Sequence, residues 1–333
     1  MMSAMVDMFC DMRRKLLDVA PFLNGVGRSD RPRNALRYGR APMVEPRCPD
    51  AASVRSADGT GIVVHDLGGE GPGILLSHAT GFHAHCMAPL AAALPRRRCF
   101  GLDHRGHGDA DAVDPSRLLW SSYGDDALAA AHHACEVVGG PVTGVGHSMG
   151  GASLIMAAVR EPDLFSALYL YEPIVFPPPD PAGSPRSESP LPAGARRRRA
   201  VFPDARTALD NFAAKKPMAS FDPAVREAYV RHGFSECDDG ITLKCAPEHE
   251  ARTYETGATS GAWETLGSLT VPTWVMSGAA APFQPSSFAH LVAERIPGAV
   301  FVRWDEMGHF GPLEHPARIA AWIDASETSR LHR

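Results

Sequence analysis

Short apolar runs alternate with longer helix-like stretches along this chain from about Val54 onward. The apolar runs predict buried strands at residues 61–67, 74–77, 98–102, 142–145, 167–171, 273–276 and 299–304. The longer stretches predict helices at residues 88–94, 125–138, 150–160, 285–295 and 316–325. Strands and helices in this alternation are typical of a mostly parallel sheet with helices on both faces.

This alternation is interrupted between Pro173 and about Thr270. The segment opens with a Pro- and Ser-rich stretch, and several helix-like segments follow it. An insertion of this size in an α/β core is most simply interpreted as a cap; the alternative is a surface insertion with no catalytic role. The four arginines at 196–199 are interpreted as a solvated face, with an interaction role as the alternative.

Composition excludes several classes of protein. The chain has 333 residues, of which 44% are hydrophobic and 21% charged, so it is neither fibrous nor wholly disordered. Lys plus Arg total 33 against 38 Asp plus Glu, a net charge of -5, and we expect no nucleic-acid partner. We expect a small-molecule substrate; the sequence does not determine the oligomeric state.

The cysteines and the N-terminal segment bear on disulfide bonds, metal binding and cellular location. Seven cysteines, irregularly spaced and without a CxxC pair, argue against a disulfide framework and a zinc site, so we expect buried reduced thiols and no metal. No apolar run approaches the ~18 residues of a membrane helix, and no clean signal peptide is recognisable. We therefore expect a cytoplasmic protein. Residues 1–50 are expected to form a poorly ordered leader. Alternatively, residues 1–42 are sequence upstream of a true start near Met43.

The strongest chemical signal is Gly146-His147-Ser148-Met149-Gly150, between a predicted strand and a predicted helix. This is the context in which G-x-S-x-G forms a nucleophile elbow, a turn so sharp that only small residues fit on either side. A serine hydroxyl needs a base to take its proton. His309 follows the last predicted strand and is the expected base, whereas His78, His104 and His107 precede the serine and are expected to support loops or line the pocket.

Four motifs in this order carry a family resemblance. They are Ser77-His78-Ala79-Thr80-Gly81-Phe82, Asp103-His104-Arg105-Gly106-His107-Gly108, residues 146–151 and Gly308-His309-Phe310. With them the chain resembles the capped branch of the α/β-hydrolase superfamily from about Val54 to Ala325. The resemblance implies an α/β-hydrolase fold, with a core at 51–172 and 271–333 and a helical cap at 173–270, inserted after the sixth strand.

A catalytic triad also needs a carboxylate that orients the histidine. The position of this carboxylate departs here from the common pattern of the superfamily. That pattern has an Asp in a G-x-x-D-x-x-x-P stretch, where this chain has Ala281. Glu172, at the end of the preceding strand, is the expected replacement, as in certain haloalkane dehalogenases that this arrangement resembles. Glu306 is the rival, and a hinge carboxylate is the alternative role for Glu172.

The resemblance also implies an oxyanion hole formed by the backbone N–H groups of Met149 and Thr80. Ala79 stands where glycine is usual, which requires a permissive backbone angle at that position. Neither a GxGxxG signature nor a P-loop is present, so we expect no cofactor.

These residues predict a serine esterase acting on a small, uncharged, moderately hydrophobic ester. The alternatives are a carbon–carbon bond hydrolase or cofactor-free perhydrolase on the same fold, and a receptor-like binding protein with weak turnover. A set of apolar residues is expected either beneath the cap or in the core: Phe82, Met87, Met149, Phe176, Phe212, Met218, Phe221 and Trp263.

Overall fold

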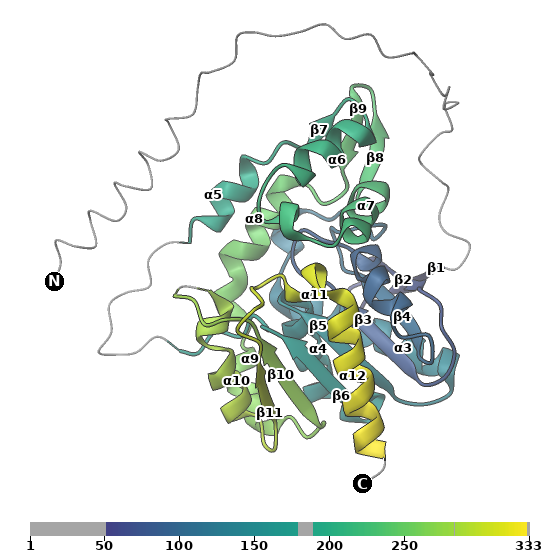
Figure 1. The fold of residues 1–333 in the computed structure, drawn as a ribbon, viewed down its shortest axis with the longest axis vertical. Coiled ribbons are helices and arrows are strands. Elements are labelled where there is room, and N and C mark those ends of the chain that lie inside the picture. The colour runs from purple at the N-terminus through teal and green to yellow at the C-terminus, as the bar shows by residue number, and fades with distance from the viewer. Residues whose placement is uncertain (1–50, 179–188, 283, 332–333) are drawn as a thin grey trace, which may run out of the picture. The chain divides into compact units, whose positions relative to one another are not determined.

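The computed structural model describes residues 51–178, 189–282 and 284–331, which all belong to one compact unit of the chain (Figure 1). The expected leader at 1–50 lies outside the described residues.

An eight-stranded sheet forms the centre of the described fold. Its spatial order is β1-β2-β4-β3-β5-β6-β10-β11, and only the pairs β1–β2 and β2–β4 are antiparallel. The strands are β1 (Ala51–Arg55), β2 (Gly61–Asp66), β3 (Gly73–Ser77), β4 (Arg98–Asp103), β5 (Val142–His147), β6 (Phe165–Tyr171), β10 (Thr273–Ser277) and β11 (Val300–Arg303). All seven predicted strands are therefore confirmed, and β1 is an addition that the apolar pattern did not reveal.

Helices cover both faces of this sheet, because successive strand residues point to opposite sides. Leu75, Leu168 and Leu170 pack into one core with α3 and α4, whereas Leu76 and Tyr169 pack into the other with α2 and α12. The helices of this part are α2 (Ala88–Ala92), α3 (Trp120–Val138), α4 (Met149–Arg160), α10 (Ala289–Arg295), α11 (Gly311–Glu314) and α12 (Pro316–Leu331).

The residues between β6 and β10 form a separate group of elements, coloured teal to green in Figure 1. The sequence predicted only helices here, but the described part also contains a three-stranded antiparallel sheet of order β7-β9-β8. Its strands are too short and polar to stand out as apolar runs. The elements are α5 (Leu191–Arg196), β7 (Val201–Phe202), α6 (Ala205–Ala213), α7 (Pro223–His232), β8 (Phe234–Cys237), β9 (Gly240–Leu243), α8 (Pro247–Thr256) and α9 (Ala262–Thr265).

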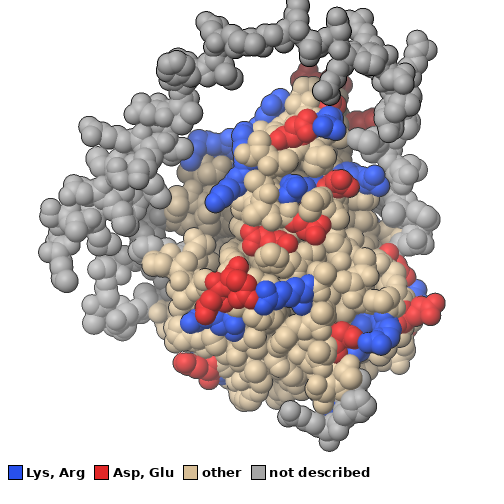
Figure 2. Space-filling view, in the orientation of Figure 1, with Lys and Arg blue, Asp and Glu red and all other residues tan. Residues whose placement is uncertain are grey.

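The distribution of surface charge and the burial of the cysteines can be compared with the expectations from the sequence. Basic and acidic side chains lie interspersed on the face drawn in Figure 2, in agreement with the weak net charge. The described cysteines are all free: Cys86, Cys99 and Cys245 are buried and Cys135 is partly buried, but Cys237 at the end of β8 is exposed, so the expectation of burial is wrong for that thiol. Within the described ranges, none of the helices combines the length and apolar character that a membrane crossing requires.

Candidate active site

Ser148 occupies the turn between β5 and α4 in a strained backbone conformation. Its φ is 57° and its ψ is -115°, a region that residues with a side chain rarely adopt. A Cβ on Gly146 would lie 2.6 Å from Cα of Gly151, and a Cβ on Gly150 would lie 2.1 Å from the carbonyl oxygen of Ser77. The two glycines of the motif are therefore required by backbone packing, as a nucleophile elbow demands.

Glu172 and His309 come together at the same edge of the sheet. Nδ1 of His309 donates to Oε2 of Glu172 at 2.7 Å. The other carboxylate oxygen, Oε1, accepts a hydrogen bond from the backbone N–H of Gly278 at 2.8 Å. Glu172 is fully buried, while the His309 side chain retains 17% of its exposure. The Glu172 carboxylate is thus fixed by the Gly278 N–H, whereas part of the His309 imidazole remains accessible.

The backbone at Glu172 is as unusual as that at the serine. Its φ is 44°, and Ser148 and Glu172 are the two described non-glycine residues with positive φ. The N–H of Glu172 donates to the carbonyl of Met276 in β10 at 2.8 Å, which extends the β6–β10 pairing by one residue. The side chain is thereby directed toward the loop after β10. Strain of this kind is concentrated at functional sites.

The rival carboxylate lies elsewhere. Glu306 is about half exposed and forms an ion pair with Arg318. Ala281, at the position where the common pattern has an aspartate, donates its N–H to Oγ of Ser286 at 3.1 Å. Glu172 is accordingly the carboxylate in contact with His309.

The residues expected to supply the oxyanion donors, Thr80 and Met149, are both buried: Met149 is the first residue of α4, and Thr80 lies in the loop after β3. The N–H of the first residue of a helix has no acceptor within that helix. Ala79 has no positive φ, because the only such non-glycine residues in the described ranges are Ser148 and Glu172. The alanine therefore fits this position without strain.

The three earlier histidines support loops. His78 donates through Nδ1 to the carbonyl of Ala79 at 2.8 Å, and His104 shares a hydrogen bond of 2.8 Å with Oγ of Ser77. Nε2 of His107 accepts from the N–H of Gly81 at 3.1 Å. Burial lowers the pKa of His107 to about 4, so it is neutral at pH 7 and can accept this hydrogen bond.

His147, the residue before Ser148, fixes the loop of the expected base. Its Nε2 donates to the carbonyl oxygen of His309 at 2.8 Å. Burial, together with the neighbouring His309, lowers the pKa of His147 to about 3, so it remains a neutral donor. No pattern along the chain indicated this role for His147.

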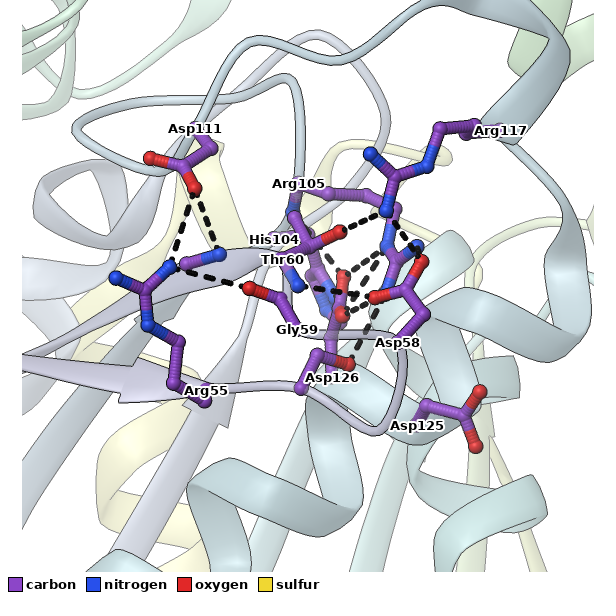
Figure 3. Close-up of polar contacts among 12 residues, drawn as sticks. Arg55, Asp58, Gly59, Thr60, His104, Arg105, Asp111, Arg117, Asp125 and Asp126 are labelled. Atoms are coloured by element: carbon purple, nitrogen blue, oxygen red, sulfur yellow. Dashed lines mark hydrogen bonds and ion pairs between the residues drawn. The ribbon is translucent and has the colours of Figure 1, made fainter.

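A buried arginine holds the loop that follows β4 (Figure 3). Arg105 is fully buried, and its Nη2 donates to Oδ1 of Asp126 at 2.6 Å while its Nη1 donates to Oδ2 of Asp58 at 2.8 Å. Asp58 also accepts from Arg117 at 2.9 Å. His107 follows Arg105 in the same loop. The network therefore also fixes His107, which accepts the hydrogen bond from Gly81.

The expected apolar residues separate into two groups. Phe82 lies 5.8 Å from Phe221 and 6.0 Å from Phe310, measured between ring centroids, so it packs between the inserted segment and the His309 loop. Phe212, Met87 and Met218 belong to the same apolar cluster. The other members, Met149 and Trp263, belong to the cluster on the opposite face of the sheet, and Phe176 packs against Phe288.

One group of side chains has the spacing of metal ligands. In the described part of the chain, His65, Asp103 and Asp109 have ligand atoms within 4.8 Å of one another. However, Lys244 donates to Asp109 at 2.5 Å, and Asp103 already accepts from His65 at 2.8 Å and from the N–H of Ala84 at 2.7 Å. The lysine supplies the positive charge here, so these side chains form an ion-pair network.

The arginine run of the inserted segment was only partly anticipated. Arg196, Arg197 and Arg199 are exposed, as expected for a solvated face, but Arg198 is half-buried and forms an ion pair with Glu250 of α8. Sequence reasoning missed Glu250, because a single glutamate in a polar helix resembles any surface residue. The only sign of this pairing in the sequence was a group of three glutamates, Glu248, Glu250 and Glu255, in the same inserted segment as the arginine run.

Comparisons with known proteins identify the family of this chain. The model of the alpha/beta hydrolase family matches residues 74–322, and the chain belongs to this family. It is 32% identical to monoglyceride lipase of Rattus norvegicus over 117 residues, which cover 33% of this chain and 38% of the lipase. It is 25% identical to the type I acyl-CoA thioesterase mpaH of Penicillium brevicompactum over 200 residues, 60% of this chain and 42% of the thioesterase.

These matches span about two fifths of the length of the curated relatives. Among solved structures, E-2-(acetamidomethylene)succinate hydrolase has a TM-score of 0.66 at 19% identity, with 82% of this chain and 97% of that chain covered. A thermophilic esterase from Thermogutta terrifontis has a TM-score of 0.61 at 21% identity, with 84% and 98% covered. Both likenesses show the α/β-hydrolase fold.

Proposed function

We propose that this protein is a serine hydrolase that cleaves a carboxylic ester of a small, moderately hydrophobic substrate through an acyl-enzyme on Ser148. The observation that carries the proposal is the 2.7 Å contact between Glu172 and His309, at the same sheet edge as the strained serine. A nucleophile, a base and an acid that orients the base are the parts that acyl transfer requires.

In the first half-reaction, Nε2 of His309 takes the proton of the Ser148 hydroxyl as Oγ attacks the ester carbonyl. The N–H groups of Met149 and Thr80 stabilise the oxyanion, and each such donor is worth roughly 2.7–4 kcal/mol in the transition state. The bond to the alcohol oxygen breaks, and His309 gives the alcohol its proton. A water molecule then attacks the acyl-enzyme in the same way and releases the acid.

Glu172 orients His309 and stabilises the imidazolium that forms in each half-reaction. Because Nδ1 of His309 donates to Glu172, Nε2 is left as the basic nitrogen. The carboxylate accepts from both Gly278 and His309, so both of its oxygens are held in place.

The residues at 173–270 serve as the cap in this proposal, over the core formed by 51–172 and 271–333. The packing of Phe221 from this segment against Phe82 and Phe310 supports this, because both partners lie beside proposed site residues. Apolar side chains at this position favour a substrate with an apolar acyl or alcohol part.

A fluorophosphonate probe and a substrate panel test the proposal. The probe should label wild-type protein at Ser148 and leave Ser148→Ala unlabelled. The panel should contain matched carboxylic esters, thioesters, amides, a β-diketone and a peracid assay, with Ser148→Ala and His309→Ala as controls. Ester hydrolysis that disappears in both variants supports the proposal. A wild-type protein that is labelled but turns over only the thioester, amide, diketone or peracid substrate would reassign the reaction, and one that is not labelled would favour a binding protein.

A further inference from the structure

Helix α8 lies directly on the loops that carry the proposed site. Nδ1 of His249 is 3.4 Å from the carbonyl oxygen of Gly106, in the loop after β4. Thr253 is bonded to α3, since its carbonyl accepts from Nε1 of Trp120 at 3.1 Å and its hydroxyl contacts that of Tyr123 at 2.7 Å. The helix is therefore anchored on both sides of Glu250.

Glu250 faces the loop of the proposed oxyanion donor. A Cβ built on Gly81, the residue after Thr80, would lie 3.0 Å from the carboxyl carbon of Glu250. This glycine has a φ of 82°, so the loop turns beneath the carboxylate with no side chain between them. An acidic group of the inserted segment is thus in contact with the residue next to a proposed oxyanion donor.

Arg198 and two tyrosines surround this carboxylate. Nη1 of Arg198 donates to Oε2 of Glu250, and the hydroxyl of Tyr254 donates to Oε1 at 3.1 Å. Nη2 of Arg198 donates to the hydroxyl of Tyr229 at 2.5 Å. The arginine side chain is 25% exposed and the glutamate side chain 10% exposed. Charges in such a place interact strongly with a substrate, because little water screens them.

The pair has an electrostatic consequence for the reaction. A lone carboxylate beside the oxyanion loop would repel both the developing oxyanion and any negative group on the substrate, and a lone guanidinium would attract them. Together the two charges cancel at a distance and present a polar but neutral surface. Burying an ion pair rarely stabilises a fold more than apolar residues would, so a role in selection is the better reason for its position.

We propose that Arg198 and Glu250 are specificity-determining residues that, as a neutralised pair beside the oxyanion loop, favour esters whose acyl part carries no charge. This inference rests on the proposed ester hydrolysis at Ser148. Without Glu250, the remaining arginine favours esters with a negatively charged acyl part. Without Arg198, the remaining glutamate favours esters with a positively charged acyl part. Removal of both restores the neutral preference.

Three esters of similar length test this: phenyl hexanoate, the monophenyl ester of adipic acid and phenyl 6-aminohexanoate. Phenol release gives kcat/KM for each at pH 7.5, and the ratio of a charged ester to the neutral one is taken within each protein preparation. Such a ratio does not depend on the fraction of protein that is folded. The variants are Glu250→Gln, Arg198→Gln and the double substitution. The matched control is Arg196→Gln, whose arginine pairs at 2.7 Å with the exposed Glu248.

The adipate-to-hexanoate ratio should rise roughly tenfold in Glu250→Gln, and the aminohexanoate-to-hexanoate ratio should rise roughly tenfold in Arg198→Gln. The double variant and Arg196→Gln should show wild-type ratios. Ratios that stay at the wild-type value in both single variants overturn the inference while leaving ester hydrolysis intact. A wild-type protein that hydrolyses none of the three esters, or Ser148→Ala that still hydrolyses them, overturns the proposed function and this inference with it.

Discussion

Oε2 of Glu172 lies 2.7 Å from Nδ1 of His309, although 137 residues separate the two in the chain. The carboxylate comes from the end of β6, one strand away from the loop in which the common superfamily pattern has its aspartate. Two features make this possible: the positive φ of Glu172 directs the side chain toward β10, and the N–H of Gly278 holds its second oxygen. Glu172 thus reaches His309 from the strand next to the one that carries the aspartate in the common pattern.

Replacing Glu172 by glutamine should reduce kcat by roughly 10³–10⁴-fold, because the amide can no longer stabilise the imidazolium or fix the tautomer of His309. Glu172→Asp should lose less, since its shorter carboxylate remains charged. Steady-state hydrolysis of p-nitrophenyl butyrate gives these values. Glu306→Gln is the matched control and should keep wild-type kcat; a loss there with an active Glu172→Gln would reverse the assignment.

Gly150→Ala should destabilise the protein by more than about 3 kcal/mol, because the new Cβ would meet main-chain atoms that cannot move aside. The nearest, the carbonyl oxygen of Ser77, is at 2.1 Å. Gly140→Ala is the control, since a Cβ there has nothing within 4 Å. Urea unfolding measures both. Equal stability of the two variants would show that β3 and the start of α4 are not packed as described.

Arg105→Met should cost about 3–5 kcal/mol, because it leaves the buried Asp126 carboxylate without its counter-charge. Arg117→Met removes a partner of Asp58 at a side chain that is 48% exposed, and should change stability by about 1 kcal/mol or less. The two free energies of unfolding come from the same urea titrations. A small effect of the Arg105 substitution would mean that water reaches Asp126.

The stability of the protein should fall as the pH is lowered from 6.5 toward 4.5. Burial lowers the pKa of His83 and His107 to about 4 and that of His85 and His147 to about 3. In this window the unfolded chain binds protons that the folded chain does not, so each group contributes stability above pH 6.5 that is lost on acidification, by up to about 1.4 kcal/mol per pH unit. His65 acts in the opposite sense, because despite its burial the hydrogen bond to Asp103 raises its pKa.

Unfolding in urea at pH 7.5, 6.5, 5.5 and 4.5 checks this dependence. His85→Phe keeps a ring against His232, on which His85 stacks at 3.8 Å between centroids, but removes one titrating group. Its pH dependence should be shallower than that of the wild type. An unchanged slope would mean that His85 is already protonated in the folded state.

Most of the core could be predicted from sequence because its strands are continuous apolar runs and its turns carry glycine at fixed positions. The motif around Ser148 indicated the elbow, and the missing aspartate at Ala281 directed attention to Glu172. The inserted segment was harder, since β8 has only Phe234 buried and β9 only Leu243. The contact of Glu250 with Gly81 depends on how α8 is placed on the core, which no local pattern encodes.

In the proposed reaction, catalysis proceeds through an acyl group on Ser148. The most direct measurement is the mass of peptides from wild-type protein that is quenched in acid during turnover of p-nitrophenyl butyrate. A butyryl group on the peptide containing Ser148, accompanied by a burst of p-nitrophenol equal to the enzyme concentration, is the predicted result. A butyryl group on another residue, or undiminished hydrolysis by Ser148→Ala, would contradict it.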